Sequence, residues 1–133
     1  MTVSFHNPPG APAPLADRYS NLAAVDLGPV TLLVLSGQVA IDHDGSFVGT
    51  DMTTQSEQIF QAIGAMLAAH DATFEHVVNI RTYLVDMDQL ADYGAVRRKY
   101  FTGTPPTSTT VEVSRLFRTD ALLEVDITAV VAH

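Results

Sequence analysis

The sequence predicts an α+β protein in which a mixed sheet carries two helices on one of its faces. Two observations lead to this class. Short apolar stretches bounded by turn residues indicate strands, and two longer segments with apolar residues at helical spacing indicate helices. The elements follow the order ββαβαββ without an internal repeat or a low-complexity tract. Residues 1–133 are therefore expected to form a single domain.

The first two strands are expected at residues 21–26 and 31–36. Residues 26–29 read Asp-Leu-Gly-Pro, a combination typical of turns, and this turn joins the two strands. Residues 1–16 contain four prolines and are expected to form an ordered arm or a loose lead-in. The pattern therefore places the first regular structure after the proline-rich segment.

Two amphipathic helices come next. The first is expected from about residue 53 to residue 70. Thr53 or Thr54 can cap it, and Glu57 follows Thr54 at the distance of a capping box. The second helix is expected at about residues 88–101. Their apolar sides consist of Ile59, Ile63, Met66 and Leu67 in the first helix, and of Leu90, Tyr93, Val96 and Tyr100 in the second.

The remaining strands are expected at residues 77–85, 109–113 and 122–131. The first of them alternates between Val78, Ile80 and Leu84 on one face and Asn79, Arg81 and Tyr83 on the other. Because two helices cover only one face of a sheet, solvent or a partner subunit must meet the other face. That face is expected to carry apolar side chains together with Asn79, Arg81, Tyr83, Glu112, Glu124, Asp126 and Thr128.

Composition excludes several classes of function. A formal net charge of −8 disfavours nucleic-acid binding, which depends on many Lys and Arg contacts to phosphates. The basic cluster Arg97, Arg98 and Lys99 is interpreted as the solvated end of a helix. The absence of cysteine excludes disulfides and thiolate chemistry. No apolar stretch is long enough to span a membrane, and residues 1–16 do not resemble a signal peptide, so a cytoplasmic protein is expected.

Motifs for metals and cofactors are missing as well. The five histidines are scattered along the chain, and none of them has the spacing of a metal-binding pair on a helix. The sequence contains neither a Gly-rich phosphate loop nor Gly-x-Ser-x-Gly. We therefore expect no metal, no cofactor and no serine-hydrolase triad.

Several short motifs, taken in order, resemble the Rid (RidA/YjgF/YER057c/UK114) family over about residues 11–132. They are Tyr19-Ser20, Ser36-Gly37-Gln38-Val39, residues 77–87, Val111-Glu112-Val113-Ser114-Arg115-Leu116 and Leu123-Glu124-Val125-Asp126. The resemblance implies a chorismate-mutase-like fold and a homotrimer whose sheets form a central barrel, with ligand clefts between subunits. Family members include deaminases that hydrolyse enamines and imines to keto acids and ammonia; an older family name is endoribonuclease L-PSP.

The sequence departs from the family pattern at two positions. Deaminating members bind the substrate carboxylate with an arginine in a Pro-Ala-Arg motif, and here Ser108 stands at that position. Serine cannot reproduce the charged, bidentate fork of arginine. Gly94 stands where many members have asparagine. The chain is therefore interpreted as a divergent member without the motif arginine.

The resemblance implies a set of site residues. Glu124 matches the glutamate that positions or activates the attacking water, Tyr19 matches a tyrosine at the cleft rim, and Gly37 matches a main-chain ligand contact. Ser108 and Thr109 can donate hydrogen bonds to an oxyanion. Each of these residues can also have a structural role: Glu124 as a salt-bridge partner, Tyr19 in packing, Gly37 in a bulge and Thr109 as an ordinary strand residue.

Arg81 leaves two interpretations open. By strand alternation it points toward the uncovered sheet face, and it can replace the missing arginine as the carboxylate binder. It can also form a structural ion pair with Glu112, Glu124 or Asp126.

Two functional hypotheses result. The first is an enamine or imine deaminase, a hydrolase acting on a small carboxylate-bearing molecule in clefts between subunits, with Glu124 and Arg81 as catalytic residues. The alternative is a non-catalytic binding or regulatory trimer that has kept the cleft and lost the chemistry. Ribonuclease activity is disfavoured by the acidic charge.

Overall fold

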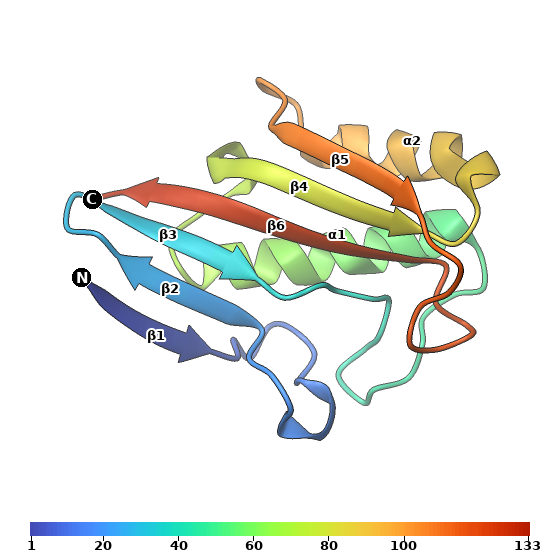
Figure 1. The fold of residues 1–133 in the computed structure, drawn as a ribbon, viewed down its shortest axis with the longest axis horizontal. Helices are drawn as coiled ribbons and strands as arrows, with labels where there is room; N and C mark the ends of the chain where they lie inside the picture. Colours follow the sequence, from blue (N-terminus) through green and yellow to red (C-terminus); the bar gives the residue numbers. More distant parts are fainter.

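The computed structural model describes residues 1–133 and contains one six-stranded sheet with two α-helices behind it (Figure 1). The strands are β1 (Thr2–His6), β2 (Leu22–Asp26), β3 (Val30–Leu35), β4 (Val77–Leu84), β5 (Thr107–Glu112) and β6 (Leu123–Ala132). The helices are α1 (Met52–Ala68) and α2 (Leu90–Tyr100). The expected α+β class, with a mixed sheet and two helices on one face, is therefore confirmed.

The strand order in the sheet is β1-β2-β3-β6-β4-β5. All neighbours are antiparallel except β4 and β5, which are parallel. Parallel strands need a long crossover, and α2 supplies it between these two strands. The last strand in the sequence, β6, lies between β3 and β4 in the middle of the sheet.

The hydrophobic core lies between the helices and the sheet. Ile80 and Leu84 of β4 and Val125 of β6 are fully buried there, as are Ile59 and Phe60 of α1. These strand residues alternate with side chains on the other side of the sheet, which we call the open face because neither helix covers it (Figure 1). Neither helix is long and apolar enough to cross a membrane.

The open face has an apolar part and a polar part. The pairing register places Phe5, Ala23 and Val34 side by side across β1, β2 and β3. Phe5 and Val34 are exposed there, by 67% and 37%. On the other part, β4 and β6 pair Arg81 with Asp126 and Tyr83 with Glu124.

One strand was missing from the predicted order, because β1 lies within the proline-rich segment that the sequence leaves as an arm or lead-in. The structure therefore has the order βββαβαββ. β1 is an edge strand that pairs only with β2, and its side chains are mostly exposed, so it lacks the half-buried alternation that identifies a strand.

Two side chains lie on the opposite side from the predicted one, and a third is more exposed than predicted. A register shift between Val77 and Asn79 turns Val77 into the core and leaves Val78 45% exposed. Glu112 pairs with Leu84 in the parallel register and therefore lies on the helix side, where it accepts a hydrogen bond from the amide of Met87. Leu90 is 42% exposed because it begins α2, at the end of the apolar stripe.

The predicted cap of α1 was wrong as well. Asp51 is the N-cap, and its Oδ1 accepts a hydrogen bond of 2.8 Å from the amide of Thr54. Thr54 donates its hydroxyl to the same carboxylate instead of capping the helix itself. Glu57 forms an ion pair with Lys99 and accepts a hydrogen bond from Tyr100, so it joins α1 to α2.

Candidate functional site

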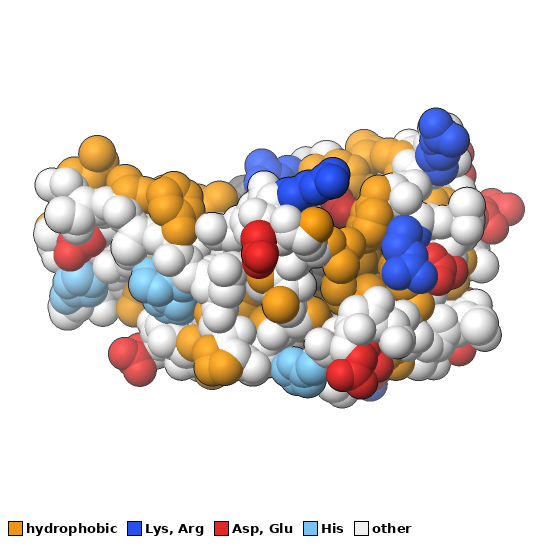
Figure 2. All heavy atoms as spheres, turned by 90° about the horizontal axis from the view of Figure 1, so that it is seen from below, with side chains coloured by type: hydrophobic (Ala, Val, Ile, Leu, Met, Phe, Trp, Pro, Cys, Tyr) orange, Lys and Arg blue, Asp and Glu red, His pale blue; other side chains and the backbone are white.

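A cavity of about 430 Å³ opens beside the end of β3, on the side of the sheet that carries β1. Seen from that edge, the surface is hollowed, with hydrophobic side chains in the hollow and basic side chains around it (Figure 2). Residues 12–21 form one wall, Ser36–Val39 and Ile41 form the second, and Phe117 and Glu124 close the third. We call this hollow the Glu124 cavity.

Main-chain pairing fixes the position of Glu124. After β3 ends, the amide of Gln38 donates to the carbonyl of Val125 at 2.8 Å, and the amide of Val125 donates back at 3.0 Å. This bridge presses Gly37 against the neighbouring side chain of Glu124. A Cβ on Gly37 would lie 2.6 Å from an oxygen of the Glu124 carboxylate, so the carboxylate would have to move from its present position. Glycine at position 37 therefore gives the carboxylate its place.

A buried polar network supports the second wall. The Gln38 side chain, 5% exposed, donates to the side-chain oxygen of Asn21 and to the carbonyl of Ser36. Asn21 in turn donates to the carbonyl of Pro12 at 2.7 Å, and the Ser36 hydroxyl donates to the carbonyl of Ser20. These bonds tie residues 12–21 to the end of β3, and buried polar groups that are satisfied in this way hold a wall rigidly.

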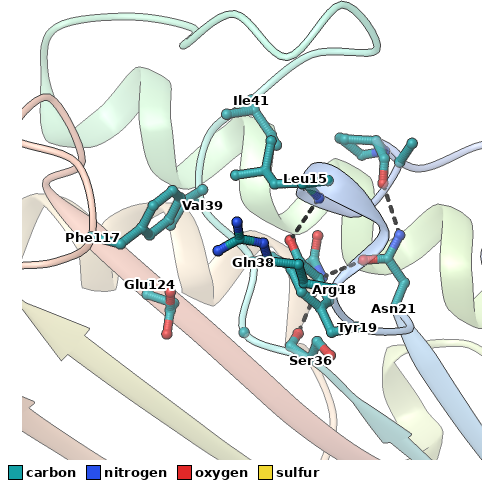
Figure 3. A pocket seen from close by; sticks show the side chains of 14 residues that line it. Leu15, Arg18, Tyr19, Asn21, Ser36, Gln38, Val39, Ile41, Phe117 and Glu124 are labelled. Carbon is teal, nitrogen blue, oxygen red and sulfur yellow. Dashed lines mark hydrogen bonds between the residues drawn. The ribbon is translucent and has the colours of Figure 1, made fainter.

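A short 3-10 turn, Leu15–Asp17, precedes two side chains that line the cavity, Arg18 and Tyr19. Ala16 and Asp17 adopt φ values of 53° and 52°, which are uncommon for residues with a Cβ. The Tyr19 hydroxyl accepts a hydrogen bond from the amide of Leu15. Figure 3 shows the Arg18 side chain extending across the cavity toward the side of Phe117 and Glu124. Arg18 forms no ion pair within the chain.

Electrostatics distinguish the two carboxylates of the open face. Asp126, 8% exposed, accepts hydrogen bonds from Arg81 Nε at 2.7 Å and from the Tyr83 hydroxyl at 3.3 Å, and Arg81 Nη2 lies 2.6 Å from the same carboxylate. Glu124 has no such partner. Its partial burial, and then the negative charge of Asp126, raise the pKa of the Glu124 carboxyl above its ordinary value. The Glu124 carboxyl therefore binds a proton more tightly than the carboxyl of an exposed glutamate does.

Burial, and then the nearby charge of Asp126, also raise the pKa of the Tyr83 hydroxyl, and the hydrogen bond to Asp126 raises the pKa of Arg81. Arg81 thus stays charged and bound to Asp126. The structure contains no group of three or more His, Cys, Asp or Glu side chains that could hold a metal ion.

Comparison with known proteins places this chain in a family. The family model described as Endoribonuclease L-PSP matches residues 10–131. The chain is a Rid-family protein. Protein DfrA of Myxococcus xanthus is 38% identical over 113 residues, which cover 84% of each chain. A RutC family protein of Saccharolobus solfataricus is 35% identical over 120 residues, 90% of each chain.

Solved structures agree with this assignment. A member of the conserved Rid protein family from Yersinia pestis matches with a TM-score of 0.87 and 29% identity, over 98% of this chain and 100% of the other. A yeast protein, YEO7, matches with a TM-score of 0.86 and 28% identity, over 96% and 98% of the two chains. The Rid resemblance predicted from the sequence motifs is therefore confirmed.

Of the predicted site residues, three meet at one place and three do not. Tyr19, Gly37 and Glu124 all line the Glu124 cavity. The other three lie elsewhere in the chain. Arg81 is on the open face in its ion pair with Asp126, and Thr109 is beside it on β5. Ser108 points to the helix side, where its hydroxyl accepts a hydrogen bond of 3.1 Å from Arg97 of α2.

Arg18 was not predicted as a site residue, although it lines the same cavity as Glu124. It precedes the Tyr19-Ser20 motif directly in the sequence. A basic residue beside a motif residue, in a chain with only seven basic residues, was the available signal. Its orientation depends on the φ values of Ala16 and Asp17, which no sequence pattern indicates.

Proposed function

We propose that this Rid protein hydrolyses the C=N bond of a small imine or enamine, with Glu124 as the acid–base group. The observation that carries the proposal is the Glu124 carboxyl itself. It has no ion-pair partner, it faces a cavity of about 430 Å³, and its pKa is raised by burial. A partly buried carboxyl with a raised pKa is suited to general acid–base catalysis.

The reaction consumes one water, and Glu124 transfers each of the protons that move. In the first step the Glu124 carboxylate takes a proton from water while the water oxygen bonds to the protonated imine carbon, which gives a carbinolamine. In the second step the Glu124 carboxyl returns that proton to nitrogen, and the C–N bond breaks while the hydroxyl proton of the carbinolamine passes to the Glu124 carboxylate, which leaves the carbonyl product and ammonia. Ammonia then takes this proton from Glu124 and departs as ammonium. Glutamate is thereby regenerated, and no further reactant is consumed.

Two neighbours assist in this scheme. The Arg18 guanidinium extends into the Glu124 cavity and carries a charge that a substrate carboxylate can pair with in a bidentate manner (Figure 3). The Tyr19 ring, 43% exposed, lies in the wall of the same cavity and can cover an apolar part of the substrate. Arg18, and not the paired Arg81, is therefore the substrate anchor in this proposal.

Exchange of the acid–base group tests the proposal. Glu124→Gln keeps the size of the side chain but cannot shuttle a proton, so we expect the rate of ammonia release from a panel of unstable imines and enamines to fall by about a hundredfold or more. Arg115→Gln, in an exposed arginine outside the cavity, should retain the wild-type rate. A wild-type protein that never accelerates hydrolysis, or a Glu124→Gln variant that is fully active, would refute the proposal.

A non-catalytic binding protein is the second candidate. It is favoured by Ser108, which stands at the position of the motif arginine and is bound to Arg97 instead of facing the open side. Saturable binding of a small acid at the Glu124 cavity without any turnover would support this function.

We further propose that three copies assemble with their open faces around one axis. Support comes from the apolar part of that face, where Val3 and Phe5 are exposed by 48% and 67% and nothing in the chain covers them. Exposed apolar patches of this kind are typical of subunit interfaces.

A further inference from the structure

Two histidines from distant parts of the chain meet at the β1 edge of the sheet. His6 is the last residue of β1, and His70 follows the C-terminal end of α1. Their ring centres are 4.9 Å apart, and the ring planes are inclined by 75°. Both residues are partly exposed, and neither lines the Glu124 cavity. We call them the His6–His70 pair.

Strand alternation brings His6 to this place. Val3 and Phe5 of β1 are exposed on the open face, so Ser4 and His6 point to the side of the helices. The contact with His70 thus joins an edge strand to the helix layer. Within the sheet, β1 has only β2 as a neighbour. A ligand held by both rings would therefore fasten the edge strand to α1.

Each ring has one nitrogen bound within the chain and one nitrogen without a partner there. His70 Nδ1 lies 3.3 Å from the carbonyl oxygen of Met66, and it carries the proton of this hydrogen bond because a carbonyl only accepts. The lone pair of the neutral His70 ring is therefore on Nε2. His6 Nε2 bonds to the Ser4 hydroxyl at 2.8 Å, which leaves Nδ1 without a partner. Metal-binding histidines commonly have this arrangement, in which a polar group orients the ring and the second nitrogen binds the ion.

The separation of the two rings fits a shared metal ion. Two imidazoles that each place a nitrogen about 2.1 Å from one zinc ion have ring centres roughly 5 Å apart. The observed separation of 4.9 Å is close to this value. The torsion about the Cβ–Cγ bond of histidine is broad, so both rings can turn their second nitrogens toward one point without a change of the backbone.

The chemistry of the pair favours one class of cation. The net charge of −8 raises the local concentration of cations around the protein. Imidazole nitrogen suits Zn²⁺, Cu²⁺ and Ni²⁺, whereas Mg²⁺ and Ca²⁺ prefer oxygen ligands. Neither histidine takes part in an ion pair within the chain, so both second nitrogens stay available.

From these observations we propose that the His6–His70 pair binds one divalent transition-metal ion, with Zn²⁺ as the representative. His6 Nδ1 and His70 Nε2 are the two protein ligands, and water completes the tetrahedral shell. Ordinary zinc centres have three or four protein ligands, so this ion is held more weakly and exchanges with solvent. Ligand spacing along one helix could not indicate the site, because its histidines come from a strand and from a helix end.

Residue-resolved NMR titration tests the site, with zinc chloride as the probe and magnesium chloride as the comparison. Zn²⁺ should shift the ring signals of His6 and His70 together, and the shift should saturate with one ion per chain. Mg²⁺ at the same concentration should leave both rings unshifted, because it prefers oxygen ligands. Unshifted ring signals in the presence of Zn²⁺, or an equal response to Mg²⁺, would overturn the proposal.

Exchange of either histidine should remove the site. His6→Gln and His70→Gln should each weaken Zn²⁺ binding by about tenfold or more, because each removes one of two ligands. The double variant should bind hardly more weakly than the single variants, because one histidine alone already holds the ion poorly. His43→Gln, the matched control in an exposed loop, should keep the wild-type affinity. Additive losses in the double variant, or a loss with His43→Gln, would contradict a shared site.

Melting temperatures separate loss of the ligand from loss of the fold. Melting without metal shows that each variant is folded. Zn²⁺ should raise the melting temperature of the wild type and of His43→Gln, because an ion bound only by the folded state stabilises that state. It should not raise the melting temperature of His6→Gln or His70→Gln. A stabilisation by Zn²⁺ that persists in these two variants would show binding elsewhere and would refute the proposal.

This inference is independent of the proposed hydrolysis. Glu124→Gln removes the acid–base group and should bind Zn²⁺ as the wild type does, whereas His70→Gln should release ammonia at the wild-type rate. Failure of one of these two properties in the wild type, with the other present, therefore tells which of the two proposals is wrong.

Discussion

At the scale of single residues, the open face separates two carboxylates that lie two positions apart on β6. Asp126 is paired with Arg81 and accepts a further hydrogen bond from Tyr83, so it has a structural role. Glu124 lies at the cavity with a raised pKa and no cation of its own. The same strand thus supplies a fixed negative charge and, beside it, a carboxyl whose proton affinity depends on that charge.

This pair makes a prediction about pH. If the Glu124 carboxylate is the base, activity should rise as the pH passes its pKa, which lies above the ordinary value of 4.5. Asp126→Asn removes the nearby negative charge and frees Arg81, and both changes lower the pKa of Glu124. The acidic limb of the pH–rate profile should therefore move to lower pH in this variant. An acidic limb that stays at the same pH, or that moves to higher pH, would contradict the assignment of Glu124 as the base.

The sequence predicts part of this site and misses part of it. Glu124, Gly37 and Tyr19 were predicted from short motifs, and they do line one cavity. Whether they act on a ligand stays a prediction. For Arg81 the sequence left two roles open, a carboxylate binder and a structural ion pair. The structure contains the ion pair, with Asp126, because the register of β4 and β6 places these two residues side by side. Arg18 was not predicted, because its position depends on the left-handed backbone conformation of Ala16 and Asp17.

At the scale of the elements, strands and helices with a buried face were predictable and their ends were not. Ile80, Leu84 and Tyr93 are buried as their spacing indicates. In contrast, β1 was not predicted, because it is an edge strand whose side chains are mostly exposed. The bulge at Val78 was not predicted either. One extra residue in a strand reverses which side chains face the core, and the amino-acid composition of the strand does not indicate it.

The cap of α1 allows a test at this scale. The hydrogen bonds from Thr54 lower the pKa of Asp51 below its ordinary value of 3.8, so Asp51 stabilises the fold above this pH and loses the effect as the pH falls through its folded-state pKa. Asp51→Ala should lower the melting temperature at pH 7, and the difference should shrink on acidification below about 3.8. Asp44→Ala, in an exposed loop, is the control. A pH-independent difference would argue against capping by the carboxylate.

At the scale of the whole molecule, the open face of the sheet is the surface through which we propose that three copies assemble. If three copies join through their open faces, light scattering should give about three times the chain mass of 14.3 kDa. Val34→Lys places a charge in the apolar part of that face and should shift the protein toward monomers. Leu27→Lys, at an exposed apolar residue in the β2–β3 turn, should leave the mass unchanged. A wild-type monomer would refute the trimer.

The position of β6 between β3 and β4 affects how the chain reaches its native state. The N-terminal hairpins and the β4–β5 unit touch each other in the sheet only through this strand, which is made last. The two parts can therefore join into one sheet only after residues 123–132 have been made. The pairing of β6 with β3 and β4 is therefore a late step between segments far apart in the sequence. We expect slow folding, and dependence on chaperones at high expression, as a consequence.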